Sequence, residues 1–266
     1  MRSLAGWFAL LCAAALLAAC GTPSRPDPAA APAGVPAGTT WDSMKGLPDW
    51  HGAWTKPEPL DQGPFVACCI AGSTTVPLTP KFLAIRDQAA RSIQKGVGVS
   101  NNIVTCQPDG VPSNLLHGLA HQYLFTPGLV VMLLEDGEVR RIHTDGRAHP
   151  PLGTLHTSVE GDSIGHWEGG TLVVDTVGMS TEANLFLTNG MKVGRDTHVV
   201  ERIALRDKDT LRIETTITDP EIFSAPYTYA LLYTRLLREE DFDIGCSQSN
   251  RDNDQTLDLT PPPEDD

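Results

Sequence analysis

From residue 129 onward, apolar and polar residues alternate in short runs that are separated by turn residues. Such alternation predicts β-strands with one buried face, because successive side chains of a strand point to opposite sides. Asp136-Gly137 and Gly169-Gly170 lie between neighbouring runs and are typical of tight hairpin turns. The predicted strands span residues 122–126, 129–135, 138–144, 162–168, 171–177, 197–205, 210–218, 227–238 and 242–246.

One helix is predicted over residues 80–95, ahead of the strands. Thr79 is a good N-cap, Pro80 suits the first helical position, and Gly96 favours termination. We expect the helix to lie across the sheet or to plug an opening in it. Its narrow apolar stripe comprises Phe82, Ile85, Ala89 and Ile93.

This order of elements predicts a mainly β fold. Strands and helices do not alternate, which argues against an α/β fold. An open sheet of this many strands would leave its edges unpaired. We therefore expect an antiparallel meander that closes into a barrel or a sandwich, with the N-terminal helix packed on it.

The charge of the chain excludes one class of partner. Its 266 residues include 20 Lys and Arg against 33 Asp and Glu, a formal charge of −13. Affinity for nucleic acid comes largely from Lys and Arg, and no window of this sequence concentrates them. We therefore expect no nucleic-acid partner.

Residues 1–19 resemble a bacterial lipoprotein signal peptide. Arg2 precedes an apolar run that is too short to cross a bilayer, and Leu17-Ala18-Ala19-Cys20 resembles the lipoprotein box. In such proteins the leader is cut before the cysteine, so Cys20 is the expected lipidation site, which would carry palmitate-type chains. An ordinary signal peptide with a cysteine near its cleavage site is the alternative. Gly21 follows the cysteine, and by resemblance to lipoprotein sorting this implies the periplasmic side of the outer membrane.

Composition divides the remaining chain into three parts. Residues 20–40 are rich in Pro, Ala and Gly and predict a tether, because they contain too few large apolar residues for a core. Residues 41–250 suit a single β-rich domain. Residues 251–266 are acidic and predict a disordered tail.

Cysteines suggest disulfide chemistry in an oxidising compartment. Our preferred pair is Cys106 with Cys246, since a bridge there would tie an early loop to the last strand and constrain the unfolded chain. Adjacent Cys68 and Cys69 would form a strained vicinal disulfide. A reactive or metal-binding role for these two thiols is the alternative.

Several segments together resemble a large family of secreted bacterial proteins. Residues 163–178 read SIGHWEGGTLVVDTVG, which is similar to that family's G-x-W-E-G-x-T-L-V-V-D-T signature. The other matching segments are GAW at 52–54, LTP at 78–80, CQPDGVP at 106–112, VRRIHTDGR at 139–147 and HVVER at 198–202. The resemblance implies an envelope location and a β-rich fold, and it implies no particular activity. Gly170 and Met179 depart from the Asp and the aromatic residue usual at these positions.

A weaker resemblance concerns two tryptophans. Gly52-Ala53-Trp54 and Gly165-His166-Trp167 are similar to the Gly-x-Trp motif of lipocalin-like barrels, in which the indole closes one end. The alternative is a tryptophan that packs over a glycine of a neighbouring strand.

Polar residues that share strand faces form a candidate acid/base site. If the faces meet in a barrel mouth, His166 next to a carboxylate could act as a general base, and Arg141 could hold an oxyanion. The alternative is that these residues are solvent-facing cross-strand pairs. The candidate catalytic residues are His166, His143, His198, Glu168, Asp175 and Arg141.

His117 and His121 have a spacing that would place both rings on one helical face, a geometry that binds Zn²⁺. The motif lacks the glutamate of metalloproteases, and Gly118 weakens a helix there. Zinc is therefore an alternative to the expectation that the protein needs no cofactor.

Aromatic residues suggest a place for an apolar ligand. Tyr227, Tyr229 and Tyr233 lie on one face of a predicted strand and, with Trp167, could line a pocket with polar tips. Ordinary core packing explains the same pattern. Our leading hypothesis is a lipid-anchored periplasmic binding or carrier protein for a small, mainly apolar or aromatic molecule. The rival hypothesis is an acid/base lyase, isomerase or hydrolase.

Overall fold

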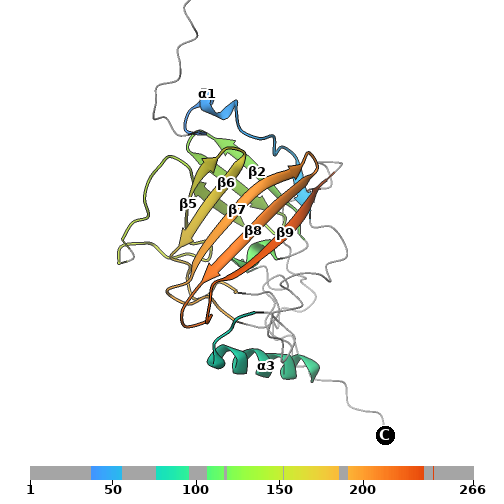
Figure 1. Cartoon of the computed structure of the whole chain (residues 1–266), viewed down its shortest axis with the longest axis vertical. Coiled ribbons are helices and arrows are strands. Elements are labelled where there is room, and N and C mark those ends of the chain that lie inside the picture. The colour runs from blue at the N-terminus through green and yellow to red at the C-terminus, as the bar shows by residue number, and fades with distance from the viewer. Residues whose placement is uncertain are drawn as a thin grey trace, which may run out of the picture. The chain divides into compact units, whose positions relative to one another are not determined.

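Nine strands follow one another around a closed barrel in the computed structural model, which describes residues 37–55, 76–95, 107–116, 119–151, 153–185, 191–236 and 242 (Figure 1). This confirms the predicted mainly β fold and decides for a barrel over a sandwich. The strands are β1 (Ala53–Thr55), β2 (His121–Thr126), β3 (Leu129–Leu134), β4 (Val139–His143), β5 (Asp162–Glu168), β6 (Thr171–Val177), β7 (His198–Asp207), β8 (Thr210–Thr218) and β9 (Tyr227–Arg235). The helical elements described are α1 (Trp41–Met44), α3 (Pro80–Gln94) and the 3-10 turn η1 (Ser113–Leu115).

Two features of the strand order were not predicted. Strands β4 and β5 are parallel, with Ile142 beside Ser163, whereas the other neighbouring pairs are antiparallel. A parallel pair needs a long crossover, which residues 144–161 supply. Strand β1 closes the barrel by pairing with both β2 and β9. It is too short to show the alternation by which the longer strands are recognised.

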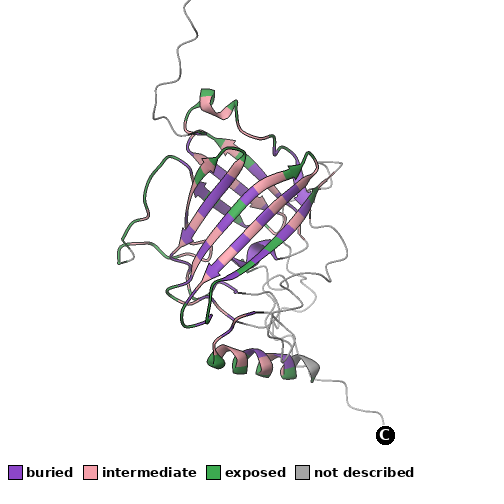
Figure 2. Ribbon diagram, in the orientation of Figure 1, coloured by how far each residue is buried: buried purple, intermediate pink, exposed green. Residues whose placement is uncertain are grey.

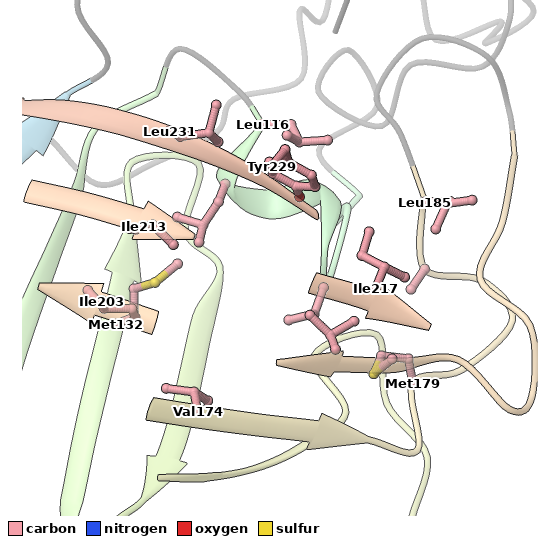
Figure 3. Close-up of a cluster of buried hydrophobic side chains, with 14 of the residues drawn as sticks. Leu116, Met132, Val174, Met179, Leu185, Ile203, Ile213, Ile217, Tyr229 and Leu231 are labelled. Atoms are coloured by element: carbon pink, nitrogen blue, oxygen red, sulfur yellow. The ribbon is translucent and has the colours of Figure 1, made fainter. Parts of the chain in front are cut away.

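Alternate side chains of the strands fill the interior. Strand β8 shows the pattern clearly, because Leu211, Ile213, Thr215 and Ile217 are buried while the residues between them are half-buried (Figure 2). Side chains from β3, β6, β7, β8 and β9 point inward and meet in one apolar core (Figure 3). Predicted alternation and observed burial agree along these strands.

Residues 107–116, which contain η1, close one end of the barrel. Val111, Leu115 and Leu116 are buried, the Val111 N–H donates to Val159 O at 3.1 Å, and the Tyr233 hydroxyl donates to Leu115 O at 2.5 Å. We call this segment the plug and this side of the barrel the plugged end.

Of the two placements expected for helix α3, across the sheet or plugging an opening, the second is taken by residues 107–116 at the plugged end. The start of helix α3 is held by the loop before β9, where the Thr79 N–H donates to Ile222 O at 2.8 Å and Lys81 pairs with Glu221. Its buried side centres on Arg86 and Ala90. Ile85, predicted to face the core, is 38% exposed. No helix in the described ranges is long and apolar enough to cross a bilayer.

The opposite end carries the β2–β3, β5–β6 and β7–β8 turns, and we call it the hairpin end. The segment around α1 crosses this end (Figure 1), and the Gly128 N–H donates to Gly38 O at 2.8 Å. Trp54 of the Gly-x-Trp motif is fully buried, and the Arg235 guanidinium lies 4.3 Å from its ring centroid. An indole covered by a cation from the last strand thus helps to close the wall.

Candidate functional site

Four aromatic side chains gather inside the hairpin end. The Trp50 ring centroid lies 5.1 Å from that of Tyr123, 5.4 Å from Phe125 and 5.4 Å from Trp167. Phe125 and Trp167 are 5.6 Å apart. Because these rings meet mainly edge to face, they form a cohesive apolar surface. We call these four residues the aromatic cluster.

A hollow of about 230 Å³ borders the aromatic cluster. Strand β1 pairs with the start of β2, at His121 and Gln122. On this side, the later half of β2 therefore lies beside the segment before β1 and not beside a paired strand. Leu124, which lines the hollow, is 45% exposed, so the hollow reaches the surface. Its lining residues are Pro48, Asp49, Trp50, His51, Tyr123, Leu124 and Phe125.

A buried ion pair lies deeper in the barrel. Arg140 Nη2 of β4 lies 2.5 Å from Glu201 Oε2 of β7, and the two side chains are 0% and 2% exposed. The same guanidinium donates from Nε to Ser163 Oγ at 3.2 Å and from Nη2 to Thr176 Oγ1 at 2.8 Å. Charge in this low-dielectric interior is therefore balanced and fixed in place.

Several buried polar atoms around this centre have no hydrogen-bond partner among the described residues. They include Arg140 Nη1, the Tyr123 hydroxyl, and the indole nitrogens of Trp50 and Trp167. Burial, reinforced by the Glu201 charge, raises the pKa of Tyr123, so its hydroxyl keeps its proton. These four groups are therefore donors without an acceptor among the described residues, whereas unpartnered acceptors such as Glu138 Oε2 and Glu160 Oε1 belong to carboxyl groups beside the plug.

The predicted tyrosines of β9 do face inward. Tyr227, Tyr229 and Tyr233 are all buried. Tyr233 is bonded to the plug through its hydroxyl, and Tyr227 stacks on Phe223 with centroids 5.9 Å apart. Of the predicted ligand-binding residues, Trp167 is therefore the one that belongs to the aromatic cluster.

Two predicted catalytic residues meet on the outer wall of the barrel. His198 Nε2 lies 2.7 Å from Asp175 Oδ1. His149, which was not predicted for this role, lies with Nε2 3.3 Å from the same oxygen and with Nδ1 3.2 Å from Asp162 Oδ2. The arrangement is a histidine–carboxylate–histidine bridge, and its Asp175 side chain is 42% exposed.

The other predicted catalytic residues also lie outside the barrel, and not in its mouth. His166 and Arg202 both bond Glu168, with His166 Nε2 3.1 Å from Oε1 and Arg202 Nη2 2.8 Å from Oε2. Arg141 is exposed and His143 half-exposed on strand β4. Alternation assigned these residues to shared faces, but it did not say which face is internal.

Of the two histidines of the alternative zinc site, the structure describes His121. His121 begins strand β2 and lies inside the barrel, with its ring 5.3 Å from Tyr123 and 4.6 Å from Tyr233, so it is not on a helical face. Burial lowers its pKa to about 3. No group of three or more potential metal ligands occurs among the residues that the structure describes. Outside those residues lie His117, Cys20, Cys68, Cys69, Cys106 and Cys246, and the predicted strand at 242–246 apart from residue 242.

A pair of buried carboxyl groups at the plugged end was also missed. Glu138 Oε1 accepts from the Asp109 and Gly110 N–H groups, and Glu160 Oε2 accepts from Asn114 Nδ2 at 2.9 Å. Burial and a hydrogen bond with Glu160 raise the pKa of Glu138. Through these hydrogen bonds the two carboxyl groups hold the plug against the wall.

Comparison of the chain with models of known protein families gave no match, and comparison with curated proteins gave none either.

Proposed function

We propose that this protein is a binding or carrier protein whose barrel takes up a small, mainly apolar or aromatic molecule at the aromatic cluster. The observation that carries the proposal is the hollow bordered by Trp50, Tyr123 and Phe125. Small-molecule sites are typically concave and apolar, with a few polar groups that fix orientation. The aromatic cluster supplies the apolar surface, and the interior donors supply the polar groups.

The cellular setting belongs to the same proposal. We infer that the chain is lipidated at Cys20 and anchored on the periplasmic side of the bacterial envelope, in the outer membrane. The resemblance to the lipoprotein box supports this inference. Metabolic labelling with radioactive palmitate tests it: label should enter the wild type and not Cys20→Ser. Equal labelling of both proteins would refute lipidation at this residue.

A fluorescence titration tests ligand uptake. The probe is N-phenyl-1-naphthylamine, an uncharged aromatic molecule that becomes bright in apolar surroundings. The Cys20→Ser chain is used so that no detergent competes for the probe. We expect saturable binding of about one probe per chain. A purely linear rise in fluorescence would overturn the carrier proposal.

The outer-wall bridge supports acid/base catalysis as a second candidate function. Asp175 Oδ1 lies within hydrogen-bonding distance of both His149 and His198, which would orient His198 as a general base. A cleft of about 480 Å³ is lined by residues that connect β4 to β5 and β6 to β7, among them Thr157 and Arg195. His198→Asn tests this role: it should abolish any lyase, isomerase or hydrolase turnover, and retained turnover would refute it.

A further inference from the structure

We propose that the ligand presents an uncharged oxygen acceptor, such as the carbonyl of a ketone, ester or quinone, to the Tyr123 hydroxyl and to Arg140 Nη1. This inference rests on the proposed carrier function and names the chemistry of its ligand. Three properties of the interior support it: two donors lack a partner, these donors lie on one inner face, and the buried charges already balance.

The first argument is that two interior donors lack a partner. Arg140 spends Nε and Nη2 on Ser163, Thr176 and Glu201, yet Nη1 has no partner among the described residues. The Tyr123 hydroxyl is likewise without one. Leaving a buried donor unsatisfied is costly, whereas an acceptor supplied by a ligand removes that cost. The interior is thus suited to a molecule that accepts hydrogen bonds.

The second argument is position. Tyr123, Met132 and Arg140 are paired in register across β2, β3 and β4, and alternate burial places all three on the inner face. Their strands are about 4.8 Å apart, so Tyr123 and Arg140 start about 10 Å from each other and extend into the same interior. Tyr123 also lines the hollow. Tyr123 therefore borders both the hollow and the interior in which Arg140 lies.

The third argument is charge. The Arg140 cation is already paired with the Glu201 carboxylate inside the barrel. A ligand carboxylate would add a second, uncompensated negative charge where water does not reach, which is unfavourable. A neutral carbonyl oxygen uses the free N–H without changing the net charge. The site should therefore discriminate against anions such as fatty acids.

Two indole N–H groups nearer the hairpin end also favour a ligand with oxygen acceptors. Trp50 Nε1 and Trp167 Nε1 are buried and have no partner among the described residues. Both rings belong to the aromatic cluster. A ligand with an aromatic body and more than one oxygen acceptor would match the rings and the donors together.

Three probes with one ring system test the inference on the Cys20→Ser chain. These are 2-acetylnaphthalene, 2-ethylnaphthalene and 2-naphthoate, which differ in having a neutral acceptor, no acceptor or a negative charge. We expect the ketone to bind about tenfold more tightly than the hydrocarbon, the factor that one satisfied hydrogen bond supplies. We expect 2-naphthoate to bind more weakly than the ketone.

The Tyr123→Phe variant keeps the ring and removes the hydroxyl, so it tests whether this hydroxyl causes the preference for the ketone. It should weaken ketone binding several-fold and leave hydrocarbon binding unchanged. Thr126→Val is the matched control, because it removes a hydroxyl from the exposed end of the same strand. Equal losses for ketone and hydrocarbon would refute the role of the hydroxyl.

The remaining outcomes separate this inference from the carrier function. If ketone and hydrocarbon bind equally, or if 2-naphthoate binds best, the acceptor inference fails and the carrier function stands. If none of the three probes binds, both fail. Should Tyr123→Phe not fold, the carbonyl stretch of ¹³C-labelled 2-acetylnaphthalene decides: hydrogen bonding shifts it to lower frequency on binding, and a frequency equal to that in hexane overturns the inference.

Discussion

Arg140 and Glu201 come from strands on different sides of β5 and β6 and meet inside the barrel, with Nη2 and Oε2 2.5 Å apart. The pair links β4, which is parallel to its neighbour β5, with β7, which belongs to the antiparallel hairpins that follow. The sequence analysis did not predict this pair, because a charged residue within a strand is ordinarily interpreted as solvent-facing.

Replacing one partner of this pair should destabilise the barrel more than replacing both partners with apolar residues. Arg140→Met leaves the Glu201 carboxylate buried and unpaired, and we expect a loss of about 3–5 kcal/mol in the free energy of unfolding. The double variant Arg140→Met/Glu201→Leu removes both charges and should recover most of that loss. Urea denaturation of the wild type, both single variants and the double variant completes the cycle. If the double variant is as unstable as Arg140→Met, the buried charge is not the cause.

Shortening Trp167 should weaken ligand uptake through the aromatic cluster. Its ring contacts those of Trp50 and Phe125, at 5.4 and 5.6 Å between centroids. Trp167→Ala should lower the affinity for N-phenyl-1-naphthylamine by about tenfold, because it removes aromatic contacts of about 1 kcal/mol each that hold Trp50 and Phe125, which line the hollow. Trp41→Ala is the matched control, since Trp41 is 70% exposed, and should change affinity less than about twofold. Equal effects of both variants would show that the probe binds elsewhere.

The strands were predictable because their pattern is local. Alternation and turn residues placed β5, β6 and β8 at the residues where they lie. Helix α3 likewise ends one residue before its predicted end. Each of these elements is encoded by residues within one continuous segment.

The site was less predictable because it depends on contacts between distant segments. Alternation placed Asp175 with Val173, but the internal face of β6 is that of Leu172, Val174 and Thr176. A signal was present, since Arg140 alternates with Ile142 and Glu201 lies between Val199 and Ile203. Those apolar neighbours on the same face indicate that both charges are internal. No such signal marks the plug, whose backbone is held by residues far away in the chain.

The outer-wall bridge should be independent of ligand uptake. Asp175 lies on the outer face of β6, and its side chain is 42% exposed. Asp175→Asn should change the free energy of unfolding by less than about 1 kcal/mol, because exposed ion pairs contribute little. Affinity for N-phenyl-1-naphthylamine should stay within about twofold. A large loss of probe binding would mean that the wall and the interior act as one site.

The carboxyl pair at the plugged end should make stability depend on pH. Burial and the Glu160 carboxyl raise the pKa of Glu138 from 4.5 to about 10 in the folded chain. Between these values the folded state keeps a proton that the unfolded state releases, so the free energy of unfolding falls as pH rises. The contribution of the pair is complete below about pH 4.5 and is lost as pH approaches about 10.

Glu138→Gln should remove this dependence, because the amide keeps the shape and still donates to Glu160 but does not titrate. Its stability relative to the wild type should increase from pH 5 to pH 9, by at most about 1.4 kcal/mol per pH unit. Urea denaturation at pH 5, 7 and 9 measures this difference. Glu168→Gln is the control: hydrogen bonds from Arg202 and His166 lower the pKa of Glu168, so its stabilising effect is lost only under more acidic conditions. If Glu138→Gln and Glu168→Gln both run parallel to the wild type, the pKa of Glu138 is not raised in the folded chain.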